Sequence, residues 1–239
     1  MRESRARPPA ASRVGGPLLA LAGAVAIVAG LYLALVQAPR DVHLGDVQRL
    51  FYLHVAVAWN GFLAFTVVLV GSALYLVTRD RRWDRLAYAS GEVGVLFMTL
   101  VLVTGSLWAR PVWNTWWTWD PRLTTSLILW FMYVGYLLIR SAAEGDARRA
   151  RYAAVYGIVA FANVPVVHLS VTWWRSIHPL VVREGQVNVD PRMVPAMVAM
   201  TLAFTLVYGW FLQQRARLEA VREALAALRA RAGEGAMSG

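Results

Sequence analysis

"AYASGEVGVLFMTLVLVTGSLW", residues 87–108, is an apolar run that holds a single charged side chain, Glu92. At a helical rise of about 1.5 Å per residue, such a run can cross the roughly 30 Å hydrocarbon core of a membrane. The chain has 239 residues, 58% of them hydrophobic, and contains five further runs of this kind. We predict an all-α integral membrane protein with six transmembrane helices, at about residues 17–36, 51–77, 87–108, 124–139, 152–171 and 193–212.

The distribution of arginine predicts the orientation of these helices. All 24 basic residues are arginine; 17 lie before the first run, at 79–85, at 140–151 or after the last run, and 7 lie in the opposite connections. Arginine accumulates on the cytoplasmic side of a membrane. Both termini are therefore expected in the cytoplasm, and the net charge of +10 reflects orientation rather than nucleic-acid binding. The expected parts are a cytoplasmic segment 1–16, a membrane domain 17–212 and a cytoplasmic amphipathic tail 213–239.

The two ends of the chain allow more than one interpretation. The basic start and Val36-Gln37-Ala38 resemble a signal peptide, but an apolar run of about twenty residues exceeds the usual 7–15, so we expect a retained helix. The tail is expected to be helical, with apolar residues at a 3-4-3 spacing. An interfacial helix is favoured there over a docking site for a partner subunit. The apolar positions of the tail are Leu218, Val221, Leu225 and Leu228.

The chain has no cysteine. This excludes disulfides, zinc thiolate sites, iron–sulfur clusters and the covalent attachment of a c-type haem. A metal or metal-containing ligand would have to be held by other side chains.

A tryptophan-rich stretch, "WNTWWTWDPRLTTS" at residues 113–126, falls in the second external connection. Single aromatic residues at helix ends are typical of membrane-interface belts. Here several tryptophans crowd one loop and are followed by Asp-Pro-Arg, which indicates a binding surface for a planar apolar ligand. The candidate binding residues are Trp113, Trp116, Trp117, Trp119, Asp120 and Arg122. We further expect Asp120 to cap the fourth helix, which begins at Pro121.

All four histidines are expected on or near the external side. His54 lies just inside the second helix, His178 in the last external loop, His168 about two turns inside the fifth helix, and His43 in a flexible stretch. Neutral imidazoles from different segments can ligate a planar metal macrocycle from above and below, as in haem. External arginines can pair with the carboxylates of such a ligand. Arginines that contact lipid headgroups are the alternative.

Three stretches resemble one known family. The tryptophan-rich stretch is similar to the WWD signature of haem-handling membrane proteins. Together with "LFYLHVAVAW" (50–59) and "NVPVVHLSVTWWRSIHP" (163–179), it resembles the CcmC family, the haem exporter proteins C of system I cytochrome c maturation. The resemblance covers about residues 45–212. This sequence departs from the family pattern at Asn114, where glycine is common, and at Pro121, which follows the motif aspartate.

The resemblance implies a function and a site. It implies that haem b is bound on the periplasmic side of the bacterial inner membrane, with His54 and His178 as axial ligands and the tryptophans as a platform. It also implies delivery of the haem to the membrane-anchored chaperone CcmE, and association with CcmD and with the ABC transporter subunits CcmA and CcmB. No catalytic residues are implied, because the family binds and delivers haem and is not a family of enzymes.

Other protein classes fit less well. System II proteins and CcmF share the WWD signature but are longer. A small solute permease would need polar groups or broken helices near the midplane, and the only candidates are Asn60, Glu92, Asn163 and a kink at Pro165. We expect Glu92 to pair with Arg79 or Arg81 instead. An enzyme would need a nucleophile–base or carboxylate pair, and the external segments offer none at a meaningful spacing.

Overall fold

The computed structural model describes residues 15–142, 146–178, 182–183, 186–187 and 189–237. Within these residues, six helical segments are long and apolar enough to cross a membrane, which confirms the predicted all-α membrane fold. A two-stranded ladder, β1 (Val182–Arg183) with β2 (Gln186–Val187), is a small addition in the last loop. The helices are α1 (Gly15–Tyr32) with its continuation η2 (Leu33–Gln37), α2 (Gln48–Thr78), α3 (Arg81–Trp113), α4 (Pro121–Ala142), α5 (Asp146–Phe161), α6 (Asn163–Trp173), and α7 (Val194–Met237), which follows the short η3 (Pro191–Met193).

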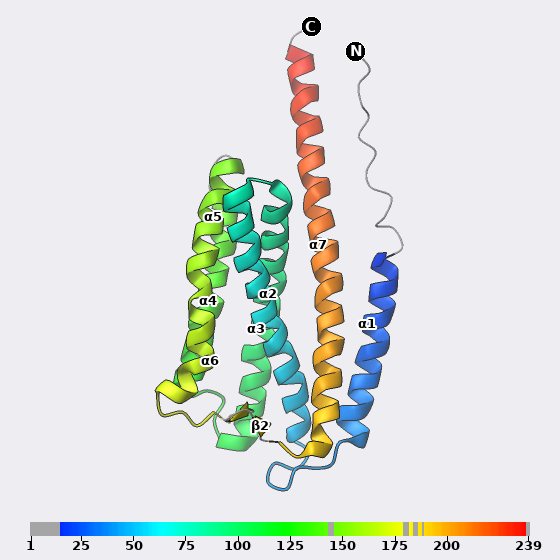
Figure 1. Cartoon of the computed structure of the whole chain (residues 1–239), viewed down its shortest axis with the longest axis vertical. Helices are drawn as coiled ribbons and strands as arrows, with labels where there is room; N and C mark the ends of the chain where they lie inside the picture. Colours follow the sequence, from blue (N-terminus) through cyan, green and yellow to red (C-terminus); the bar gives the residue numbers. More distant parts are fainter. Residues whose placement is uncertain (1–14, 143–145, 179–181, 184–185, 188, 238–239) are drawn as a thin grey trace.

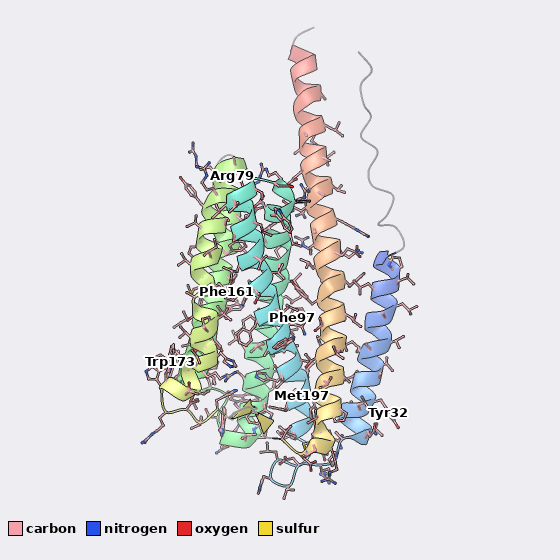
Figure 2. The ribbon with its side chains drawn as sticks, viewed as in Figure 1. Tyr32, Arg79, Phe97, Phe161, Trp173 and Met197 are labelled. Carbon is pink, nitrogen blue, oxygen red and sulfur yellow. The ribbon has the colours of Figure 1, made fainter. Side chains whose placement is uncertain are left out.

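The helices form one bundle with two distinct ends (Figure 1). The start of α1 and the end of α7 lie toward the same end, and the loop between α3 and α4 lies at the other. Figure 2 shows Arg79 and Trp173 at these opposite ends. We call them the Arg79 end and the Trp-loop end. Helices α2 and α3 are the most extensively packed pair, α7 packs on both of them, and α1 packs on α7.

Small residues allow the helices to approach closely. A side chain at Gly91 would collide with the Tyr136 ring of α4, and one at Gly94 with the Phe65 ring of α2. Gly30 of α1 similarly lies against Met200 of α7. Small residues at helix contacts favour packing inside membranes, where lipid chains compete with apolar side chains. Gly91 and Gly94, on either side of Glu92, thus allow α3 to pack closely against α4 and α2.

The fifth span consists of two helices, because Pro165 interrupts it as predicted. Proline at 165 cannot donate a hydrogen bond to the carbonyl of Phe161 and clashes with it. Accordingly α5 ends at Phe161 and α6 begins at Asn163, with a turn at Ala162. The Asn163 side-chain amide donates a 2.9 Å hydrogen bond to the Thr125 carbonyl of α4, which fixes α6 beside the start of α4.

Ion pairs join the helices in the half of the bundle toward the Arg79 end. Glu92 of α3 pairs with Arg215 of α7, through a 2.9 Å bond from the arginine Nε. Our expectation of Arg79 or Arg81 as its partner was wrong, because α7 passes directly beside this part of α3. Asp84 of α3 and Arg140 of α4 form a second pair, in which both side chains are buried.

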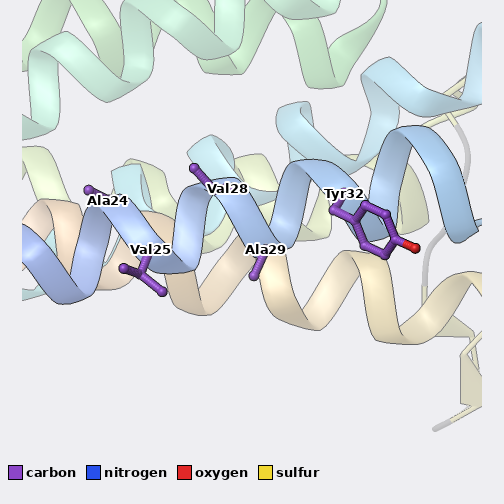
Figure 3. A pocket seen from close by; sticks show the side chains of 5 residues that line it. All are labelled: Ala24, Val25, Val28, Ala29 and Tyr32. Carbon is purple, nitrogen blue, oxygen red and sulfur yellow. The ribbon is translucent and has the colours of Figure 1, made fainter.

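Helix α7 continues past the bundle at the Arg79 end (Figure 1). Its 44 residues give a length of about 66 Å, roughly twice a membrane core. The four apolar residues of the predicted stripe are exposed on this extension. A shallow surface pocket of about 560 Å³ lies instead on α1 and is lined by apolar side chains of that helix and by Tyr32 (Figure 3). None of the candidate binding residues lines it.

Candidate functional site

His54 is held on two rigid helices at the Trp-loop end. It lies in the second turn of α2, and its Nδ1 is 2.9 Å from the Thr104 hydroxyl of α3. Its ring also contacts Gly105, where an added Cβ would lie 3.2 Å from the His54 Cε1. The packing of α2 on α3 therefore fixes the direction of this ring.

His178 lies in the loop after α6 and reaches the same region. Its ring centroid is 6.2 Å from that of Trp113, at an angle of 59°. Burial, followed by the nearby positive charges of Arg122 and His54, lowers the pKa of the His178 imidazole to about 3, against a smaller opposing effect of Asp120. The fold thus brings the two candidate axial ligands close enough to interact electrostatically, and His178 is neutral at physiological pH.

Asp120 connects the start of α4 to the His178 loop. Its carboxylate accepts a 2.9 Å hydrogen bond from the Arg122 backbone N–H, so it caps α4 as predicted. It also accepts bonds from the Ser176 hydroxyl (3.0 Å) and from the Ile177 backbone N–H (2.9 Å). The Ser176 oxygen in turn accepts the backbone N–H of His178 at 3.0 Å. A buried carboxylate therefore determines the position of the segment that carries the histidine.

The four tryptophans of the motif do not form one flat platform. Trp113 is partly buried and packs edge-on against Trp108, with ring centroids 5.3 Å apart, on the side that also contacts His178. Trp117 meets Trp119 edge-on at 6.0 Å. Trp116 is 57% exposed and Trp119 76% exposed. The motif therefore supplies one indole beside His178 and two at the surface.

The loop conformation suits asparagine at position 114. Helix α3 ends at Trp113, and Asn114 adopts a left-handed conformation with φ of 57°. Glycine and asparagine are the residues that adopt this conformation most readily at a helix C-terminus. Arg110 donates hydrogen bonds to both the backbone carbonyl (2.8 Å) and the side-chain oxygen of Asn114. Pro121 likewise fits, because it occupies the first turn of α4, where its missing N–H has no helical partner.

Arg122 supplies positive charge near both histidines. It lies close enough to both His54 and His178 to interact electrostatically with each. Asp120 attracts it, but the described residues contain no ion pair to Arg122 within 4.0 Å. A partly buried cation without a close counter-ion can receive the carboxylate of a ligand.

The other two histidines lie apart from this cluster. The His43 side chain is exposed in the loop before α2, where only its backbone N–H bonds to Asp41. The His168 side chain is exposed on α6. Within the described part of the chain, Asn163 bonds Thr125 and no hydrogen bond to the His168 ring occurs.

Two residues of the cluster were not predicted from the sequence. Thr104 lies within the apolar run 87–108, and Ser176 lies between the Trp173–Trp174 pair and His178. Neither residue belongs to a sequence motif that would have marked it as part of a site. Buried nitrogens also remain unsatisfied here: Trp108 Nε1 and His178 Nδ1 have no hydrogen-bond partner among the described residues. Unsatisfied buried polar atoms next to apolar rings are consistent with a site that binds a ligand.

Comparisons with known proteins identify the family. The family model described as "Heme exporter protein C" (CcmC) matches residues 5–231. The chain is 37% identical over 194 residues to "Heme exporter protein C" of Bradyrhizobium diazoefficiens, covering 80% of this chain and 73% of the relative. It is 31% identical over 224 residues to that of Haemophilus influenzae, covering 91% of each. A "Putative cytochrome c biosynthesis ccmC-like mitochondrial protein" of Marchantia polymorpha is 30% identical over 182 residues, covering 76% of this chain and 77% of the relative. The chain therefore belongs to the haem exporter protein C (CcmC) family, whose members are membrane proteins that handle haem for cytochrome c maturation.

Proposed function

We propose that this protein binds haem b at the Trp-loop end, with His54 and His178 as axial ligands, and passes it to the haem chaperone CcmE. One observation carries the proposal: two histidines far apart in the sequence lie close enough to interact electrostatically, with Arg122 near both of them and Trp113 beside His178. A haem ligated by two histidines needs neutral imidazoles, an apolar face and partners for its propionates. Each requirement has a matching group in this cluster.

The chemistry of the groups fits haem. His178 is neutral because its pKa is far below 7, so no proton competes with iron for it. Its buried Nδ1 and the Nε1 of Trp108 have no partner within the described residues, which suits a site completed by a ligand. Trp113 presents an indole to the haem face, and Arg122 presents a cation to a propionate. The haem itself is the cargo, and the protein holds and orients it.

Exposure of the motif suits transfer to a partner. Trp116 and Trp119 remain largely accessible at the same end of the bundle. Exposed aromatic side chains of this kind are typical of protein contact surfaces. We propose that CcmE docks here, while CcmA, CcmB and CcmD associate with the membrane domain. The arginine distribution supports a periplasmic position for the Trp-loop end and cytoplasmic termini in the bacterial inner membrane.

The alternative of a small solute permease has less support. A permease needs polar groups available to a substrate near the midplane. The Asn60 amide instead donates to the Ala56 carbonyl, the Asn163 amide to Thr125, and Glu92 pairs with Arg215. The Asn60 Oδ1 has no partner among the described residues, but the amide N–H groups of Asn60 and Asn163 and the carboxylate of Glu92 could bind a solute only by breaking a bond within or between helices.

The test is a set of four single variants, in which each histidine is replaced with glycine. Each protein is purified from haem-replete cells, and its visible spectrum is recorded before and after imidazole is added. His54→Gly and His178→Gly should lose haem or its six-coordinate spectrum, and imidazole should restore part of it by filling the vacant site. His43→Gly and His168→Gly are matched controls that should resemble the wild type.

Two outcomes would overturn the proposed site. A wild-type protein without a haem spectrum after expression with ample haem would contradict haem binding. Imidazole-rescuable loss in His168→Gly, combined with full haem in His178→Gly, would place the ligand pair deeper along α6. Either result would leave the family membership of the chain unchanged.

A further inference from the structure

The hydroxyl of Thr104 contacts both its own helix and the candidate ligand His54. Its Oγ1 lies 2.6 Å from the carbonyl oxygen of Leu100, one turn earlier in α3, and 2.9 Å from the His54 Nδ1. Both distances are those of real hydrogen bonds. Thr104 is buried, so water does not replace either contact.

The number of hydrogens decides which atom donates. A threonine hydroxyl has one hydrogen and two lone pairs, whereas a carbonyl oxygen can only accept. Two oxygens 2.6 Å apart need a hydrogen between them, so the Thr104 hydrogen points at Leu100. The Thr104 oxygen can then only accept from the His54 ring. The His54 Nδ1 must therefore carry a hydrogen, and in a neutral imidazole the Nε2 lone pair is free.

The surroundings of the ring hold this arrangement in place. The Cε1 edge of His54 lies against the backbone at Gly105, where even a methyl group would sit only 3.2 Å away. The ring is thus confined between the Thr104 hydroxyl on one edge and the bare backbone of Gly105 on another. A rotation that moved Nδ1 away from Thr104 would leave a buried N–H without a partner, at a cost of about 1–3 kcal/mol.

The two candidate ligands are supported in different ways. His54 has a side-chain hydrogen bond at Nδ1. The Nδ1 of His178 has no partner in the described residues, where the hydrogen bond that holds this histidine is made by its backbone N–H to Ser176. A hydrogen bond to the second nitrogen of a ligating histidine fixes its tautomer and direction and makes the ligand more basic. His54 is therefore the pre-organised member of the pair.

We propose that Thr104 is a positioning residue, which holds His54 in the Nδ1–H tautomer and so presents Nε2 to the haem iron. The consequence for haem rests on the proposed function, because it requires that His54 is an axial ligand. The tautomer itself does not, because it follows from contacts within the protein. The two parts can therefore be tested separately.

The tautomer is measured in the haem-free protein. Protein labelled with 15N-histidine is reconstituted in lipid, and magic-angle-spinning NMR distinguishes protonated from unprotonated ring nitrogens; the His54→Gly variant assigns the His54 signals. Wild type should show a protonated Nδ1 and an unprotonated Nε2. Thr104→Val, which has nearly the same shape, should shift His54 toward the other tautomer. Thr104→Ser should keep the wild-type pattern because it keeps the hydroxyl.

The haem consequence is measured as the rate at which haem leaves the protein for an excess of apomyoglobin. Loss of a partner that orients a metal-bound histidine typically weakens binding by about 10–100-fold. Thr104→Val should release haem at least about 10-fold faster than wild type, and Thr104→Ser should restore slow release. Thr66→Val is the matched control, because among the described residues the Thr66 hydroxyl bonds only to the Phe62 carbonyl of its own helix.

The outcomes separate this inference from the proposed function. A wild-type His54 that is protonated at Nε2, or a Thr104→Val spectrum identical to wild type, overturns the role of Thr104 whatever the haem does. If His54→Gly keeps its haem while the NMR shows the expected tautomer, the role of His54 as a ligand fails but its tautomer assignment stands. Faster haem loss in Thr104→Val that serine does not repair would show only a packing effect and would overturn positioning by the hydroxyl.

Discussion

Replacing Asp120 tests whether the motif aspartate acts by holding the His178 loop. The carboxylate is 8% exposed and accepts three hydrogen bonds, one from α4 and two from the loop. Asp120→Ala removes all three. Asp120→Asn can keep the two bonds made by the Oδ1 atom, to Arg122 N–H and to Ser176, but presents an amide N–H to the N–H of Ile177. The two variants should therefore differ in degree.

The geometry allows an estimate of the size of each effect. A hydrogen bond to a charged acceptor contributes about 1.5–3 kcal/mol, and loop groups near the surface recover part of this from water, so the low value applies. Asp120→Ala then loosens the loop by about 3 kcal/mol and, at 1.4 kcal/mol for each factor of ten, weakens haem binding by about 100-fold. Asp120→Asn loses one loop bond, which corresponds to about 10-fold. Loss of the α4 cap costs a further ~1 kcal/mol of stability in the alanine variant alone.

The assay is the rate of haem transfer to apomyoglobin, together with a thermal melt followed by circular dichroism. Ser176→Ala is the comparison variant, because it removes two loop bonds, to Asp120 and to the His178 backbone N–H, and leaves the cap intact. It should release haem about as fast as Asp120→Ala and match wild type in the melt. In an Asp120→Ala background, Ser176→Ala should add less than it does alone, since one of its two bonds is already gone. Equal effects of asparagine and alanine would refute the anchoring argument and show that the negative charge itself is required.

Three further predictions concern other parts of the molecule. Replacing the three tryptophans that precede Asp120 with alanine should lower haem yield and stop transfer to CcmE, while any remaining haem keeps its six-coordinate spectrum. Full haem and normal cytochrome c production in this triple variant would contradict a role of these side chains in holding haem and passing it on. The residues replaced are Trp116, Trp117 and Trp119. Haem affinity should stay constant between pH 7 and pH 5 in a spectroscopic titration, because His178 takes up a proton only near its pKa of about 3. If the ligand were a histidine with the usual pKa of 6.5, haem affinity would instead fall about 25-fold over that range. Asp84→Ala should destabilise the protein by about 3–5 kcal/mol because it leaves the buried Arg140 without its counter-ion, which a thermal melt would report, whereas the spectrum of bound haem should not change.

Much of the fold could be predicted from the sequence because membrane helices are specified locally. Each run needs only enough consecutive apolar residues, and each of the six predicted spans lies within one of the six apolar segments of the structure. Local rules also placed the break before Pro165 and the capping of α4 by Asp120, since both depend on residues within one turn. The exact helix ends were harder to predict. The third span was expected at 87–108, whereas α3 begins at Arg81, after the N-cap Asp80, and ends at Trp113, before the C-cap Asn114.

The candidate site could be predicted only in part. The residue types and the resemblance singled out His54, His178 and the tryptophans, but not their arrangement. The sequence grouped Trp113 with Trp116 and Trp119, whereas the structure places Trp113 beside His178 and leaves the other two at the surface. Backbone direction changes at Asn114, so neighbours in the sequence face different ways.

By itself the sequence determined that six helices cross a membrane, that the tryptophan motif lies at one end of them, and which residue types are available there. Only the tertiary structure decided which residue bonds which: Glu92 with Arg215, Asp120 with the His178 loop, and Thr104 with His54. The reason is physical. Helix formation depends on residues within about four positions, whereas these contacts depend on how neighbouring helices rotate and slide against each other as their small and large side chains pack.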